Sequence, residues 1–306
     1  MKEEFKNAAR EFKGFWPENY SSLKVLAREL NGRIAAVTSR ENFDTINYRD
    51  REWDNLIILD ACKYETFEKI NRFDGDTEKV YSNASHTRNF LKRNFKQDNH
   101  DTIYVTASPM SAGYGKYFSK IRHVWKDHWD SEKNTVLPEK VTEEAIKAHR
   151  EHPDKKIIIH YMQPHFPFIG EKAESMQSQG SFKGSRENPN VWEMLQFDEE
   201  DEETVREAYE ENLELVLPEV EKLVGSLDGK TIVTSDHGNL FGKKVGVSPW
   251  PVFGHPPNVS DEDLRAVPWL EIDGERRKTT EGEAGDEKSS HQEEKIKEKL
   301  ADLGYS

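Results

Sequence analysis

Five short apolar runs, each bounded by polar residues, constrain the fold of this chain more than any other feature of the sequence. Runs of this length are typical of strands buried on both faces of a parallel sheet. Amphipathic helical patterns lie between them, most clearly over residues 143–150 and 204–224. This alternation predicts an α/β fold in which helices cover both faces of a mostly parallel central sheet. The five runs span residues 54–60, 102–106, 156–161, 230–234 and 266–272.

The remaining segments divide the chain into three parts. Its 306 residues suit one large domain or two small ones, and we assign residues 46–273 to a single α/β domain. Residues 1–45 carry the apolar stripes of amphipathic helices and are expected to pack on this domain or cap it. Residues 170–197 are rich in Gly, Ser, Gln and Asn and predict a long loop over the sheet. The polar segment 274–306 predicts a charged, disordered tail with a final helix near residues 292–300.

The composition limits the classes of partner. The chain has 58 acidic and 44 basic residues, for a net charge of -14. Such acidity disfavours nucleic-acid binding, because phosphate backbones attract cationic surfaces. Residues 193–221 alone hold 13 acidic residues and one basic residue, so most of the charge belongs to one solvated helical segment. The single cysteine, Cys62, excludes an internal disulfide and a cysteine-only metal cluster.

Neither a membrane span nor a secretion signal is expected. No stretch reaches the roughly 20 apolar residues that a membrane helix needs. The first 16 residues lack the apolar centre of a signal peptide. We therefore expect a cytoplasmic protein.

Polar residues follow three of the predicted strands, at the edge where open α/β sheets bind ligands. Asp60 ends the first strand, His165 follows the third, and Asp236 and His237 follow the fourth. Carboxylate and imidazole groups are suitable ligands for a divalent cation. Each residue alone also fits an ordinary turn, a helix cap or local packing. Their joint placement at three strand ends favours a metal site.

A hydroxyl-rich segment, residues 81–87, precedes a helical pattern at residues 88–95. A hydroxyl at a helix start serves first as a cap. The same position suits a nucleophile, because the helix dipole and the free N–H groups favour an alkoxide and a bound anion. A neighbouring metal would lower the pKa of the hydroxyl further. Thr87 stands nearest the helix start, and Ser85 is the alternative nucleophile.

Six segments carry a resemblance to a known family. In chain order they read LDACKYETF, SNASHT, HYMQPHFPF, TSDHGNLFG, FGHPP and RAVPWLEI, within residues 50–272. This ordered set resembles the alkaline phosphatase/sulfatase superfamily, in particular archaeal sulfatase-like proteins with an LDACRYD-type motif. The resemblance implies an alkaline phosphatase-like fold over most of the chain.

The resemblance also implies a metal site and a nucleophile. Asp60, Asp236 and His237 match residues that bind one divalent metal ion. Thr87 matches the position of the nucleophile, which contacts the same metal. In different branches of the family that nucleophile is a serine, a threonine or a modified cysteine.

Four further residues match positions near the substrate. His165 matches a histidine that contacts the transferring group in sulfatases. His255 lies where the family places a histidine or a lysine near the leaving group or at a second metal. Asn239 and Lys63 are the weaker candidates for substrate binding.

Departures from the family pattern narrow the chemistry. The chain lacks the Cys-x-Pro-x-Arg signature of formylglycine sulfatases. Asp60 is followed by Ala61, whereas sulfatases tend to have two adjacent acids at this point. The sequence shows no clear Asp-x-x-x-His pair for the second zinc of alkaline phosphatase. One metal ion and threonine-dependent phosphoester chemistry are therefore favoured over formylglycine sulfate chemistry.

The sequence thus predicts a metal-dependent hydrolase of phosphoric or sulfuric esters that forms a covalent ester on Thr87. Its cofactor would be a divalent metal ion, with Mn or Zn favoured by the histidine and Ca or Mg allowed. Its substrate would be an anionic phosphate or sulfate ester, in one alternative linked to a carbohydrate. That alternative is a transferase that moves a phospho-alcohol group onto a glycan. Another alternative is an inactive, metal-stabilised binding protein.

The other histidines receive structural interpretations. His160 alternates with apolar neighbours on a predicted strand, which indicates a buried, hydrogen-bonded side chain rather than a catalytic one. Six others lie in polar or helical surroundings, and most of them are expected to be exposed: His86, His100, His123, His128, His149 and His152.

Overall fold

A seven-stranded sheet forms the centre of the computed structural model, which describes residues 20–75, 77–176, 179 and 189–285. The strands are β1 (Asn55–Asp60), β2 (Thr77–Tyr81), β3 (Asn99–Thr106), β4 (Phe118–His123), β7 (Lys156–Pro164), β8 (Thr231–Ser235) and β11 (Ala266–Ile272). Their order across the sheet is β2-β11-β8-β1-β7-β3-β4. Neighbouring strands run parallel, except that β11 runs antiparallel to both β2 and β8.

Five of these strands, β1, β3, β7, β8 and β11, coincide with the five apolar runs of the sequence. The strands β2 and β4 lie at the two edges of the sheet, and the sequence analysis missed both. Most of their side chains are partly or fully exposed. Edge strands can therefore be polar, and a search for apolar runs does not find them.

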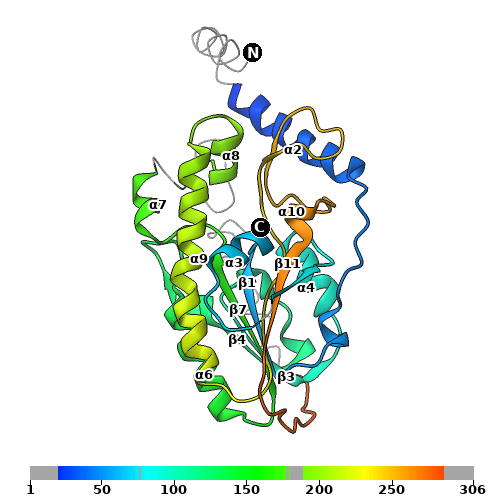
Figure 1. Cartoon of the computed structure of the whole chain (residues 1–306), viewed down its shortest axis with the longest axis vertical. Coiled ribbons are helices and arrows are strands. Elements are labelled where there is room, and N and C mark those ends of the chain that lie inside the picture. Colours follow the sequence, from blue (N-terminus) through cyan, green and yellow to red (C-terminus); the bar gives the residue numbers. More distant parts are fainter. Residues whose placement is uncertain (1–19, 76, 177–178, 180–188, 286–306) are drawn as a thin grey trace.

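Helices cover both faces of the sheet, as the sequence predicts (Figure 1). On one face, α3 (Tyr64–Ile70), α6 (Pro138–Glu151) and α9 (Glu202–Val224) pack their apolar side chains on the strands. On the other face, α4 (Thr87–Asn94) and a 3₁₀ turn at Tyr48–Asp50 do the same. The predicted α/β fold class is thus confirmed.

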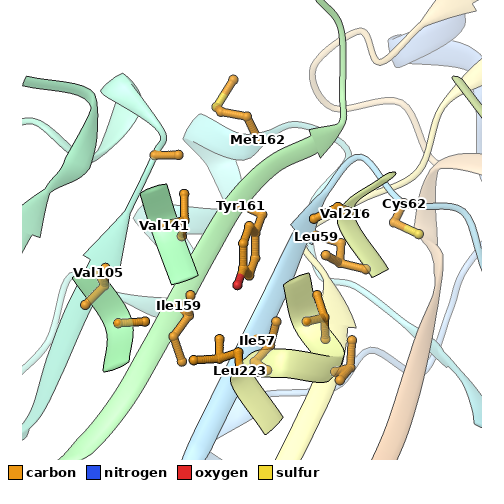
Figure 2. Packing of buried hydrophobic residues seen from close by; sticks show 14 of the residues in the cluster. Ile57, Leu59, Cys62, Val105, Val141, Ile159, Tyr161, Met162, Val216 and Leu223 are labelled. Atoms are coloured by element: carbon orange, nitrogen blue, oxygen red, sulfur yellow. The ribbon is translucent and has the colours of Figure 1, made fainter. Parts of the chain in front are cut away.

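Strict alternation along β1 assigns its side chains to the two cores. Ile57 and Leu59 point to the face that α9 covers, and Leu56 and Ile58 point to the face that α4 covers. Figure 2 shows the first of these cores, where Tyr161 lies among Ile57, Leu59 and the side chains of α6 and α9. Burying each such aliphatic side chain contributes about 1.5–3 kcal/mol, which is why the central strands are so apolar.

The acidic helix α9 forms for both local and tertiary reasons. The side chain of Asp201 caps it by accepting a hydrogen bond from the N–H of Thr204. Glu202 and Glu203 lie in its first turn, where the helix dipole favours negative charge. The second part of its buried stripe packs on the sheet and includes Leu213, Val216, Leu217, Val220 and Leu223. The first part, Val205, Ala208 and Tyr209, packs instead in a separate apolar cluster with Phe166 and Trp192.

Residues 170–197 differ from the predicted long loop. In the described part of this segment the structure has two short helices, α7 (Glu171–Ser175) and α8 (Val191–Gln196). α8 begins with a capping box, in which Asn190 and Glu193 each accept a hydrogen bond from the backbone N–H of the other. The prediction was wrong here because it used composition and overlooked this Asn-x-x-Glu spacing.

The remaining described elements surround the sheet. They are α2 (Tyr20–Thr38), α5 (Val124–Asp127), α10 (Glu262–Arg265), 3₁₀ turns at Pro109–Ser111 and Gly115–Tyr117, and the two-stranded pairs β5 (Trp129–Asp130) with β6 (Thr135–Val136) and β9 (Leu240–Lys243) with β10 (Val252–Gly254). No helix in the part of the chain that the structure describes is long and apolar enough to cross a membrane.

The two ends of the described chain both contact the α/β core. Asn31 of α2 donates hydrogen bonds to the carbonyl oxygens of Trp250 and Pro251. Residues 274–285 have no helix or strand, but Thr280 and Gly285 donate backbone hydrogen bonds to Asp154 and Phe118. Residues 1–19 and the helix expected near 292–300 lie outside the described residues. The division of the chain at residues 45 and 273 stays a prediction.

Candidate active site

The topology of the sheet brings the predicted strand ends together. β8, β1 and β7 are adjacent and parallel, so their carboxyl ends lie at the same edge. In the register, Ile58 lies opposite both His160 on β7 and Thr234 on β8. Two residues further along β1 and β8, Asp60 and Asp236 follow on this same side of the sheet. The α4 face of the sheet therefore receives both carboxylates and the His160 imidazole.

Asp60, His160 and Asp236 form a compact cluster of possible metal ligands. Each offers one ligand atom, and the three atoms lie within 4.8 Å of one another. His160 Nε2 lies 3.6 Å from Asp60 Oδ2, and none of the three residues is more than 2% exposed. Within the described structure, His160 Nε2 and Asp236 Oδ2 have no hydrogen-bond partner. Orphaned buried atoms of this kind are rare in proteins, and a divalent cation would satisfy both, so the donor set fits a metal.

The electrostatics of the cluster also favour a cation. Burial, together with the charge of Asp236, raises the pKa of Asp60 well above its usual range. Burial raises the pKa of Asp236 in the same way. Burial lowers the pKa of His160 to about 4, so its ring is neutral near pH 7, as metal ligation requires. A bound cation would supply the positive charge that keeps both carboxyl groups ionised.

Thr87 lies at the first position of α4 and points at this cluster. His86 is the N-cap, and its Nδ1 accepts the N–H of Arg88, so the hydroxyl of Thr87 is not needed as the cap. Thr87 Oγ lies 3.4 Å from both carboxylate oxygens of Asp60. It also lies 3.1 Å from His237 Nε2.

The tautomer of His237 follows from its other contact. Its Nδ1 lies 2.8 Å from the carbonyl oxygen of Gly238, which can only accept a hydrogen bond. Nδ1 therefore carries the proton, and Nε2 presents a lone pair to Thr87. Nε2 lies 3.4 Å from Asp236 Oδ2 and 3.8 Å from Asp60 Oδ1. The four residues predicted as metal ligands, Asp60, Thr87, Asp236 and His237, thus meet at one point.

His165 and His255 form a second pair of imidazoles beside this point. Their Nε2 atoms are 3.3 Å apart. His165 Nδ1 donates to the carbonyl of Phe166, and His255 Nδ1 lies 3.0 Å from Asn239 Oδ1. Nε2 of His165 therefore carries a lone pair in its neutral ring. Burial lowers the pKa of His165 to about 3 and that of His255 well below its usual range, so the pair is suited to receive a donor or a positive group.

A cavity of about 700 Å³ opens over these residues. Asp60 and Thr87 lie in its wall, together with His86, His165 and His255. The rest of the lining is mainly apolar or aromatic and includes Met110, Met162, Phe166, Trp192, Val252 and Phe253. Residues of α2, among them Asn31 and Arg33, also line it. The cavity can hold an anionic group against Thr87 and a larger organic group beyond it.

Three other predicted residues have different surroundings. Lys63 Nζ lies 3.2 Å from Asp263 Oδ1, and Lys63 is not among the residues that line the cavity. Ser85 Oγ donates a hydrogen bond to the carbonyl of Pro256 and does not line the cavity either. Asn239 is fully buried and reaches the site through its contact with His255. Among the two hydroxyls, the geometry thus favours Thr87 over Ser85.

Sequence reasoning missed the place of two histidines. His160 is buried and hydrogen-bonded to Tyr104 through Nδ1, as expected, but its Nε2 faces Asp60. The alternation Ile158–His160 along β7 was the available signal, because it puts this ring on the same face as Asp60. His86 lines the cavity rather than facing solvent. The expectation of mostly exposed histidines was wrong, since all six are partly buried: His86, His100, His123, His128, His149 and His152.

The sequence matches no protein-family model and no curated protein. Solved structures with a similar arrangement include the integral membrane protein lipooligosaccharide phosphoethanolamine transferase A from Neisseria meningitidis, with 11% identity and a TM-score of 0.49. That match covers 89% of this chain, which spans 59% of the length of the transferase.

Two further similar structures have related titles. The C-terminal periplasmic domain of EcEptC from Escherichia coli, in complex with Zn, shows 14% identity over 78% of each chain, with a TM-score of 0.48. A 2-O GAG sulfatase shows 12% identity over 72% of this chain and 64% of its own, with a TM-score of 0.42.

Proposed function

We propose that this chain is a metal-dependent enzyme that cleaves phosphoric or sulfuric esters, with Thr87 as the nucleophile. The observation that carries the proposal is the position of the Thr87 hydroxyl. It lies at a helix N-terminus, 3.1 Å from the unprotonated nitrogen of His237 and 3.4 Å from both oxygens of Asp60. Membership of the alkaline phosphatase/sulfatase superfamily, near its archaeal LDACRYD-type members, is part of the same proposal.

A divalent ion would be held by Asp60 and Asp236, with His160 and His237 on either side and the Thr87 hydroxyl within reach. A donor set of two carboxylates and imidazoles suits Mn or Zn best among common metals. When bound, the ion would lower the pKa of the threonine hydroxyl and balance the negative charge of the transferring group.

The residues of the chain supply the rest of the chemistry. Thr87 Oγ gives up its proton, because a metal ion bound beside it would lower the pKa of this hydroxyl. The lone pair of His237 Nε2, which faces Thr87, would be used to hold that metal. A bond forms from Oγ to the phosphorus or sulfur atom, and the bond from that atom to the leaving oxygen breaks. The proton ends on the leaving alcohol. Water then cleaves the ester on Thr87 and restores its hydroxyl. His165 and His255 stand where they can contact the transferring group or the leaving group.

The test is a screen of aryl phosphate monoesters, aryl phosphate diesters and aryl sulfates in the presence of Mn²⁺ or Zn²⁺. We expect Thr87→Ala to lose at least about 10³-fold in turnover, because it removes the nucleophile, and Thr87→Ser to retain measurable activity. Ser85→Ala is the matched control, because this hydroxyl belongs to the same segment but bonds to Pro256. Undiminished turnover by Thr87→Ala would exclude the nucleophile assignment. Absence of turnover on all three ester classes would favour the binding-protein alternative.

The size of the cavity favours transfer as a second candidate. A volume of about 700 Å³ exceeds the space that one phosphoryl or sulfuryl group needs and leaves room for an acceptor alcohol beside the ester. In that reaction an alcohol replaces water in the second step, as in a transferase that places a phospho-alcohol group on a glycan. Product analysis with and without an added alcohol or sugar acceptor distinguishes the two reactions. Transfer products that compete with hydrolysis would support the transferase.

A further inference from the structure

The residue that follows Asp60 has an unusual backbone conformation. Ala61 has a φ of 60°, in the left-handed region. For an alanine this conformation costs roughly 1–2 kcal/mol relative to the right-handed one. Such a residue persists only where the surrounding structure holds it in place. The strained residue, Ala61, directly follows Asp60, which is a proposed metal ligand. The contacts that hold Ala61 therefore also set the direction of the Asp60 carboxylate.

Hydrogen bonds from β8 hold one side of the turn. The N–H of Ala61 donates to Asp236 Oδ1 at 3.0 Å. The N–H of Cys62 donates to Ser235 Oγ at 2.9 Å. These two bonds join the ends of β1 and β8 and place the two proposed carboxylate ligands beside each other.

A single phenol holds the other side of the turn. The hydroxyl of Tyr209, on α9, donates to the carbonyl oxygen of Ala61 at 2.7 Å and accepts the N–H of Lys63 at 3.0 Å. Tyr209 is 1% exposed, and its ring packs edge-on against Phe241. The same apolar cluster includes Phe166 and Trp192, which line the cavity. Tyr209 therefore links the cavity wall to the turn at Asp60 through a rigid, buried side chain.

We infer that Tyr209 is a positioning residue, which holds Ala61 in its left-handed conformation and so directs the Asp60 carboxylate toward His160 and Asp236. This inference rests on the proposed function, because it assigns the turn a purpose only if Asp60 binds a metal. In the alternative interpretation, the hydroxyl of Tyr209 only finds hydrogen-bond partners at the turn. Its removal would then not affect the conformation of Ala61. The two interpretations differ in what they predict for metal binding.

The experiment is a double-mutant cycle of Tyr209→Phe and Ala61→Gly, read out as the Kd for Mn²⁺ and Zn²⁺ by calorimetric titration of the metal-free protein. Glycine adopts a φ of 60° without strain, so it should remove the need for the phenol. The matched control is Tyr161→Phe. Tyr161 is equally buried, and its hydroxyl bonds to Thr142, away from the cluster. Thermal denaturation of all variants reports the general loss of stability.

We expect Tyr209→Phe to weaken metal binding about 10-fold, within the range known for groups that orient metal ligands. Tyr161→Phe should change the Kd less than about twofold at a similar loss in melting temperature. Ala61→Gly in the Tyr209→Phe protein should restore the Kd to near that of the wild type. Folding of the double variant when Tyr209→Phe alone does not fold would support the same coupling.

Four results would overturn the inference. An unchanged Kd in Tyr209→Phe would show that the phenol does not direct Asp60. Equal losses in Tyr209→Phe and Tyr161→Phe, or a double variant that remains weak or unfolded, would show that Tyr209 acts only through general stability. If the wild type itself binds neither metal, the proposed function fails together with the inference. Normal binding by both the wild type and Tyr209→Phe would instead leave the proposed function intact.

Discussion

The two ends of the central parallel strands differ in how a buried negative charge is balanced. We call the end where these strands begin the amino edge and the end where they finish the carboxyl edge. At the amino edge, Asp54 is fully buried, and its Oδ2 lies 3.0 Å from Arg276 Nε and accepts the N–H of Lys230. At the carboxyl edge, Asp60 and Asp236 are almost equally buried. No lysine or arginine in the described chain forms an ion pair with either of them, and their nearest ionisable neighbours are histidines.

This difference between the amino edge and the carboxyl edge indicates where a cation is expected to bind. A buried carboxylate needs a positive partner, because burial without one is costly. At the amino edge the segment 274–285 supplies that partner from within the chain. At the carboxyl edge the chain supplies neutral histidines whose lone pairs point at the same place. An external cation is the partner that this edge lacks.

Of the variants that test this difference between the two edges, Asp236→Asn is expected to have the largest effect. It should weaken Mn²⁺ or Zn²⁺ binding by at least about 100-fold, since even groups outside the ligand sphere contribute 10–100-fold, and turnover should fall with it. The metal-free protein should lose little stability, because the change also removes repulsion between two buried carboxyl groups. Asp54→Asn is the control at the other edge and should lower stability without altering metal affinity. Equal metal affinities of Asp236→Asn and the wild type would refute the assignment.

A smaller effect, on stability alone, is expected for Arg277→Ala at the amino edge. The Arg277 guanidinium donates to Asn55 Oδ1, to the carbonyls of Asp54 and Lys155, and to both backbone and side chain of Asp228. Its loss would remove all five of these hydrogen bonds and leave the buried Asn55 Oδ1 without its donor, so we expect the free energy of unfolding in urea to fall by about 3 kcal/mol.

Lys278→Ala is the matched control for Arg277, because Lys278 is the next residue and is exposed. It should stay within about 0.5 kcal/mol of the wild type. The Kd for metal should be unchanged in both variants. A loss below about 1 kcal/mol in Arg277→Ala would show that segment 274–285 is not a structural part of the amino edge.

The smallest effect concerns pH and His123, which ends β4 at the carboxyl edge and is not among the proposed metal ligands. Burial lowers the pKa of His123 to about 3, and its Nδ1 accepts the indole N–H of Trp125. In the unfolded chain its pKa is near 6.5, so between these values the unfolded state binds the extra proton. Stability from this group is complete above about pH 6.5 and is lost progressively as the pH falls toward 3. His123→Gln should flatten the decline in melting temperature between pH 7 and pH 5, and an identical pH profile would contradict the prediction.

Much of the fold was predictable because it depends on local patterns. The strands β1, β7 and β8 have apolar centres and are buried over almost their whole length, since helices cover both of their faces. The cap of α8 was overlooked although Asn190 and Glu193 stand at the correct spacing. The edge strands β2 and β4 could not be found from apolar runs, because neighbouring strands lie on only one side of each and many of their side chains face solvent.

The residues of the candidate site were predictable where they stand at the ends of elements. Asp60 ends β1, Thr87 starts α4, and Asp236 and His237 directly follow β8. Such positions are visible in a single sequence. The nearness of His160 to Asp60 was not visible, because it depends on β7 lying beside β1. The pairing of Lys63 with Asp263 depends in the same way on how distant segments pack.

The sequence by itself determined which segments become buried strands, which become helices, and which polar groups stand at their ends. These properties follow from hydrophobic periodicity and capping, which act over a few residues. Only the tertiary structure decided that β8, β1 and β7 are neighbours, that three of their side chains share one face, and that Tyr209 holds the turn after Asp60. Such contacts join residues far apart in the chain, and their geometry arises only when the two cores pack on the sheet.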